Sequence, residues 1–168
     1  MASNQVMAPI AWTKSTGRDV TILQTIVANA ADQISFFSHE ATCTILKEIA
    51  PDARLETLTI DSELKSLDGF MLLEAAASLD ANIVIIYQPL SLNRTILLTT
   101  VKALINRGHT VIIRRDASLV KDAGDLFKEL SREGVLCVGD ISPEGLIPDP
   151  IGTRSLADIY APYGTDDP

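Results

Sequence analysis

The run Asn82-Ile83-Val84-Ile85-Ile86-Tyr87 is apolar at every interior position. An apolar pattern on both faces is typical of a central parallel strand that is covered by helices above and below. The run Thr110-Val111-Ile112-Ile113 has the same character. Between the two runs, residues 94–107 place apolar side chains at helical spacing, and Gly108 stands where a C-terminal cap is expected. These features predict a strand–helix–strand unit in the middle of the chain.

Strand-length apolar runs alternate with helical patterns on both sides of this unit. We expect further strands at residues 6–12, 33–37, 54–60 and 135–138, and further helices at residues 20–30, 41–49, 70–79 and 119–132. Pro51 ends the second of these helices and Gly134 follows the last. Such alternation predicts an α/β protein with three layers, in which a mostly parallel open sheet has helices on both faces.

The composition predicts one folded domain. The chain has 168 residues, of which 46% are hydrophobic and 21% are charged, values close to those of an average globular protein. From Ile141 onward the character changes, because four of the eight prolines lie between residues 143 and 162 and the chain ends Asp166-Asp167-Pro168. We therefore expect a single α/β domain at residues 1–140 and a Pro/Gly-rich acidic C-terminal arm at residues 141–168, mobile unless a partner holds it.

The net charge limits the classes of partner. At −8, the chain is repelled by nucleic acid and by anionic membranes, and no dense run of basic residues offsets this. The start Met-Ala-Ser-Asn-Gln has no basic residue and no long apolar run follows it, so we expect neither a signal peptide nor a membrane span. The expected location is the cytoplasm, and the expected partner is another protein or a second copy of the chain.

The metal- and redox-active residues are few. The two cysteines, Cys43 and Cys137, lie in apolar stretches, which predicts two reduced and buried thiols. The two histidines and two cysteines lack the close spacing of a zinc site. Acids expected at strand ends, namely Asp61, Asp116 and Asp140, are common in parallel sheets, so we predict no metal site and no cofactor.

The segment Trp12-Thr13-Lys14-Ser15-Thr16-Gly17-Arg18-Asp19 lies between an expected strand and an expected helix. That is where nucleotide hydrolases carry the phosphate-binding loop G-x-x-x-x-G-K-[ST], whose backbone N–H groups surround phosphates. Only Gly17 matches this motif, since Arg18 replaces the lysine and Asp19 the hydroxyl residue. The candidate nucleotide-binding residues are Ser15, Thr16, Gly17, Arg18 and Asp19. The alternative for Asp19 is a helix cap.

This order of elements resembles the RecA-like branch of the P-loop NTPases, above all helicases of the DnaB type. The resemblance includes the segment Ile34-Ser35-Phe36-Phe37-Ser38-His39-Glu40 and covers residues 6–113. It implies a RecA-like fold, and it makes Glu40 the match to the glutamate that polarises the attacking water. The alternative for Glu40 is a structural role, in which its carboxylate lies at the start of a helix and is stabilised by the helix dipole. In size and order, the chain is also similar to cell-division inhibitors of the SulA type.

Several departures from that family predict a loss of catalysis. The strand that resembles the Walker B strand ends in Tyr87-Gln88 instead of an acid, and the loop lacks both its lysine and its Mg²⁺ ligand. Phosphoryl transfer depends on positioning and on neutralising charge, so these losses predict that the protein is not an efficient enzyme. We expect a catalytically inactive RecA-like protein that acts through protein–protein binding as a regulatory or assembly subunit.

Four residues are candidates for that binding. Arg114 and Arg115 occupy the place where the resemblance puts a sensor facing a neighbouring subunit, with solvated surface cations as the alternative. Tyr160 and Tyr163 are candidate aromatic anchors in the arm, with an unanchored tail as the alternative. Two other functions stay open: a weak or atypical P-loop NTPase, such as a viral or phage motor subunit, and a pseudo-receiver-like regulatory domain.

Overall fold

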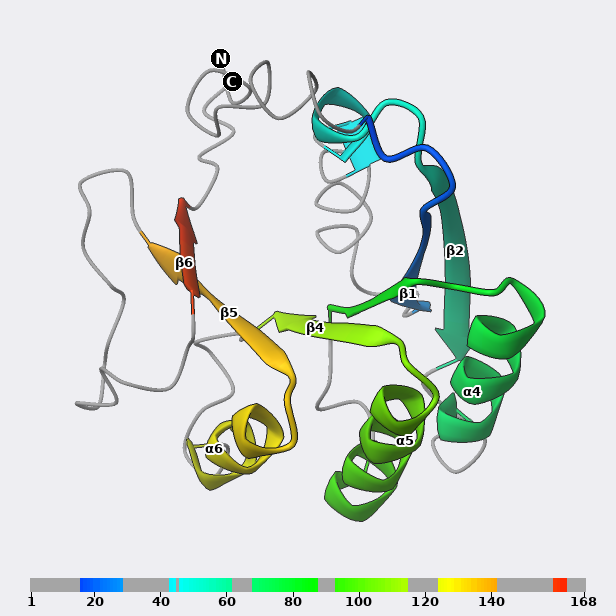
Figure 1. Ribbon diagram of the computed structural model, residues 1–168. Helices are drawn as coiled ribbons and strands as arrows, with labels where there is room; N and C mark the ends of the chain where they lie inside the picture. The colour runs from blue at the N-terminus through cyan, green and yellow to red at the C-terminus, as the bar shows by residue number, and fades with distance from the viewer. Residues whose placement is uncertain are drawn as a thin grey trace.

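The structure of the protein is a computed structural model that describes residues 16–28, 43–44, 46–61, 68–87, 93–114, 124–141 and 159–162. Strands and helices alternate along most of these residues (Figure 1). In chain order they are β1 (Thr21–Ala28), β2 (Arg54–Asp61), α4 (Asp68–Ser78), β3 (Ile83–Ile86), α5 (Arg94–Asn106), β4 (Thr110–Arg114), α6 (Gly124–Arg132), β5 (Leu136–Ile141) and β6 (Ile159–Pro162). A further helical segment covers residues 43–44 and 46–49. The expected α/β class is confirmed.

The sheet has six strands in the order β2-β1-β3-β4-β5-β6, and each neighbouring pair is parallel. The first five strands follow the 2-1-3-4-5 order of flavodoxin-type doubly wound folds. β3 lies inside the sheet between β1 and β4, as its apolar sequence predicts. The order reverses between β1 and β3. The connection that follows β1 runs toward the β2 edge of the sheet, and the connection that follows β3 runs toward the β6 edge.

Helices cover both faces of the sheet. Figure 1 shows α4, α5 and α6 side by side on one face, while the short helix at residues 43–49, drawn in cyan, lies on the other. This division follows from the right-handed crossover rule, since β1 connects to β2 in one direction and every later connection runs in the other. The three-layer arrangement expected from the sequence is therefore present.

The main core lies between the sheet and the layer formed by α4, α5 and α6. Leu23, Val84 and Val111 are register neighbours on three adjacent strands and are almost completely buried. Leu72 and Phe127, from α4 and α6, are fully buried against the same face. Burying a side chain of this size contributes roughly 1.5–3 kcal/mol, so these apolar positions account for much of the folding free energy.

The three helices end in the same way. After α5, Gly108 N–H donates to Ile105 O and His109 N–H donates to Leu104 O, the two bonds of a Schellman motif. Gly108 has φ 90° and Gly134, after α6, has φ 94°, a left-handed conformation that costs glycine little. Both glycines stand where the sequence predicts a helix end. Asp80 holds the equivalent left-handed position after α4, with φ 49°.

The first expected helix is wrong. Residues expected to form a helix from position 20 form the strand β1, Thr21–Ala28, at the centre of the sheet. The segment TILQTIVA is rich in β-branched residues, which are stiff in helices and pack well on a pleated surface. Its apolar residues also fit helical spacing because both faces of this strand are buried, and a short apolar run does not separate the two periods.

The remaining expected strands have different outcomes. The strands expected at residues 6–12 and 33–37 lie outside the described residues. The expected strand at residues 135–138 is present as β5, and β6 pairs with it from within the expected C-terminal arm. Tyr160 lies opposite Gly139, and Pro162 lies opposite Ile141. Proline is tolerated here because β6 is an edge strand. Part of the expected arm thus belongs to the sheet.

Candidate functional site

Open parallel sheets bind ligands in the crevice at the carboxyl ends of the strands, where the strand order reverses. In this sheet the reversal lies between β1 and β3. β3 ends at Ile86 and is followed by Tyr87, while Asn93 precedes α5 on the same connection. This end of β1 and β3 is therefore the candidate site, and its described polar residues are the candidates for a chemical role.

Gln24 is the centre of a polar network at this site. Its side chain is completely buried in the middle of β1, an uncommon place for an amide. Gln24 Nε2 donates to Cys43 Sγ at 3.0 Å and to Thr57 Oγ1 at 3.2 Å. Tyr87 donates its hydroxyl hydrogen to Gln24 Oε1 at 3.3 Å. The amide is thus bonded to the short helix, to β2 and to the end of β3.

These bonds explain why an amide is tolerated in the core. A buried amide without partners costs about 1–3 kcal/mol, whereas one that is fully bonded costs little. Each partner of Gln24 comes from a different element, so the network fixes β2, the short helix and the end of β3 around β1. The three partners are polar side chains, and each is hydrogen-bonded to Gln24. The arrangement stabilises the fold at the reversal point.

Tyr87 and Cys43 are both half-buried, and Cys137 is fully buried. Neither cysteine is in a disulfide bond, as expected, but the predicted burial is confirmed for Cys137 alone. Cys137 lies in the main core beneath α6, where its sulfur accepts a hydrogen bond from the Ser131 hydroxyl at 3.5 Å.

The candidate nucleotide-binding residues that the structure describes lie at the opposite end of the strands from the candidate site. Thr16, Gly17, Arg18 and Asp19 precede β1, so they lie at its amino end. The turn is closed by Val20 N–H donating to Gly17 O at 3.0 Å. It is attached to the segment before β2 through Asp52 N–H, which donates to Thr16 O at 3.0 Å.

Gly17 has a packing role in this turn. It has φ 82°, and a Cβ atom there would lie 2.9 Å from Ala50 Cβ and 3.1 Å from Ala53 Cβ. The turn leads into a strand, so the strand–loop–helix context of a phosphate-binding loop is missing. The nucleotide-binding role of these residues stays a prediction, and the strand that follows the turn does not support it. The alternative role of Asp19 as a helix cap is wrong, because no helix begins there.

The other candidate residues are not brought together by the described part of the chain. Ser15, Glu40, Arg115 and Tyr163 lie outside it. Arg114 is the last residue of β4, and Tyr160 is the second residue of β6. These two positions are on strands that are separated by β5. Their proposed roles in binding stay predictions.

Gln24 and Tyr87 were not recognised as a pair from the sequence. The signal for Gln24 is a single amide within the otherwise apolar and β-branched run TILQTIVA. A lone polar residue inside a buried strand requires a partner, and the tyrosine that ends the central strand is a natural candidate. The signal was missed because this segment was expected to be a helix, and in a helix Gln24 need not be buried.

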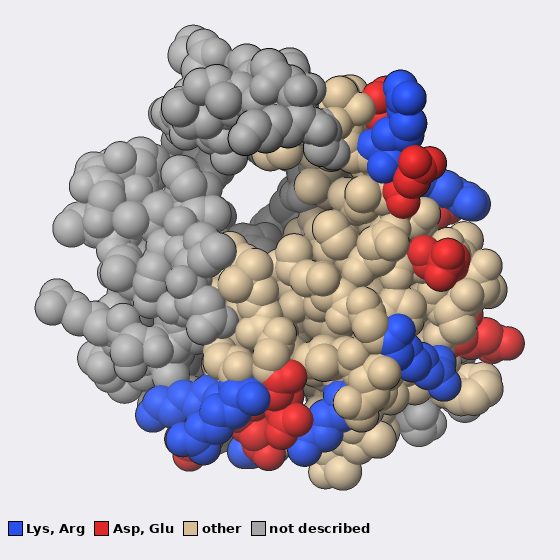
Figure 2. Space-filling view, in the orientation of Figure 1, with Lys and Arg blue, Asp and Glu red and all other residues tan. Residues whose placement is uncertain are grey.

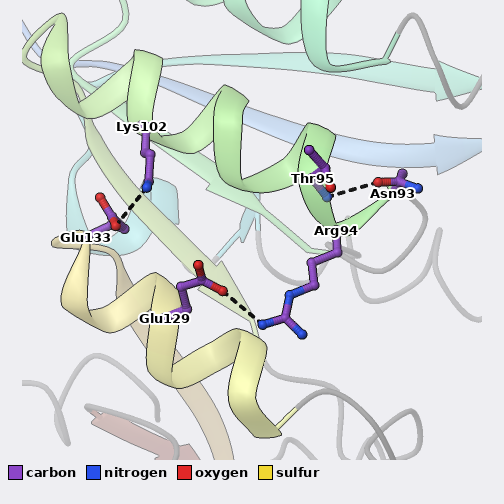
Figure 3. Close-up of polar contacts among 6 residues, drawn as sticks. All are labelled: Asn93, Arg94, Thr95, Lys102, Glu129 and Glu133. Atoms are coloured by element: carbon purple, nitrogen blue, oxygen red, sulfur yellow. Dashed lines mark hydrogen bonds and ion pairs between the residues drawn. The ribbon is translucent and has the colours of Figure 1, made fainter.

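At the surface, one ion pair joins α5 to α6 and a second joins α5 to Glu133, the residue directly after α6 (Figure 3). Arg94 Nη2 lies 2.9 Å from Glu129 Oε2, and Lys102 Nζ lies 3.0 Å from Glu133 Oε1. The basic side chains are exposed and the acidic ones are partly exposed, so each pair contributes at most about 1 kcal/mol. In Figure 2, basic and acidic side chains of the described surface lie beside one another instead of forming one large field of a single sign.

Within the described ranges, no group of three His, Cys, Asp or Glu side chains is arranged to hold a metal ion. None of the helices that the structure describes is both long and apolar enough to span a bilayer. A scan against protein-family models found no match, and a search of curated proteins found no significant match.

Proposed function

We propose that this chain is a catalytically inactive α/β protein that acts by binding other proteins, as a regulatory or assembly subunit. The observation that carries the proposal is the neutral network around Gln24 at the reversal between β1 and β3. Ligand-binding proteins of this topology use that place for recognition. Here its described polar groups are engaged in holding the strands and the short helix together.

The strand order favours one form of this function. The 2-1-3-4-5 order is that of flavodoxin-type folds, the group to which receiver domains belong. A working receiver needs an acidic pair after its first strand and an aspartate after its third, whereas Asn29 and Ala30 follow β1 and Tyr87 follows β3. A pseudo-receiver-like regulatory domain therefore fits better than a RecA-like one, which stays a prediction.

Nucleotide titration tests the proposal. We expect no heat of ATP binding to the full chain by isothermal calorimetry, with or without Mg²⁺, and no phosphate release. The matched variant is Arg18→Ala, because Arg18 is exposed and its removal is expected to leave the fold intact. Tight ATP binding that Arg18→Ala abolishes would overturn the proposal and favour the atypical P-loop NTPase. Gly17 is a poor test residue, since its substitution disturbs packing as well.

A further inference from the structure

We draw no further inference here: the strongest candidate, the surface patch at the start of α4 where Phe70 is 67% exposed and Met71 is 38% exposed, carries no proposal because nothing in the part of the chain that the structure describes shows what covers it.

Discussion

The hydroxyl group of Tyr87 donates a hydrogen bond to Gln24 Oε1 at 3.3 Å, and so joins the residue after β3 to the middle of β1. This bond crosses the boundary where the strand order of the sheet reverses. Without it, the Gln24 carbonyl oxygen would lose the partner that the structure gives it inside the core. The pair therefore links the stability of the sheet to the geometry of the candidate site.

Gln24→Leu should lower the free energy of unfolding by about 1–3 kcal/mol, because Cys43 and Tyr87 lose their bonds to the amide. Tyr87→Phe removes one hydroxyl group and should cost less, about 0.5–1.5 kcal/mol. Urea denaturation measures both values. The double variant should cost less than the sum of the two, since both substitutions remove the same bond. Strict additivity would mean that the bond contributes nothing in solution.

Gly17→Ala should destabilise the protein more than Gly108→Ala does. Both glycines have positive φ angles, 82° and 90°, so both variants carry a left-handed alanine that costs about 1–2 kcal/mol. A Cβ at Gly108 meets nothing within 4 Å, whereas one at Gly17 meets Ala50 Cβ at 2.9 Å. The added crowding should cost a further 1–3 kcal/mol, roughly. Equal losses in thermal unfolding would show that the turn moves away from Ala50 without cost.

The sequence was sufficient to predict the elements with strong local signals. β3 and β4 are apolar on both faces, and α5 has a regular apolar stripe that ends at Gly108, so each was predicted close to its observed bounds. β2 and α4 were also predicted, from alternation and helical spacing. These signals depend on neighbours within a few residues, which is why they are visible in one sequence.

β1 shows where local reasoning fails. Its eight residues satisfy helical spacing as well as strand composition, and the choice between them depends on β2 and β3, which lie far away in the sequence. Because of this error, the candidate loop at Gly17 was expected at the carboxyl ends of the strands, whereas it lies at the amino end of β1. β6 was missed for a similar reason, since its pairing with β5 outweighs the Pro-rich composition around it. Strand order likewise depends on contacts that no local pattern contains.

Asp80→Gly should raise the free energy of unfolding by about 0.5–1 kcal/mol. Asp80 holds φ 49° at the end of α4, and its neighbour Ala81 N–H donates to Ala76 O at 3.0 Å, as in the Schellman motifs of the other two helices. Glycine adopts this conformation without the Cβ strain that Asp carries. The reciprocal variant Gly134→Asp should lower the value by a similar amount in urea denaturation. A loss of stability in Asp80→Gly would mean that the carboxylate has a favourable role that outweighs the backbone strain.

Truncation after Asp149 should destabilise the folded domain, because it removes β6 and exposes the outer edge of β5. The four residue pairs between these strands suggest a loss of about 1–3 kcal/mol. The control is truncation after Pro162, which keeps β6 and removes only residues 163–168. Thermal and urea unfolding of the two truncated chains should differ by that amount. Identical unfolding would instead mean that β6 adds nothing to the sheet and that residues 150–168 act as the separate arm that their composition suggests.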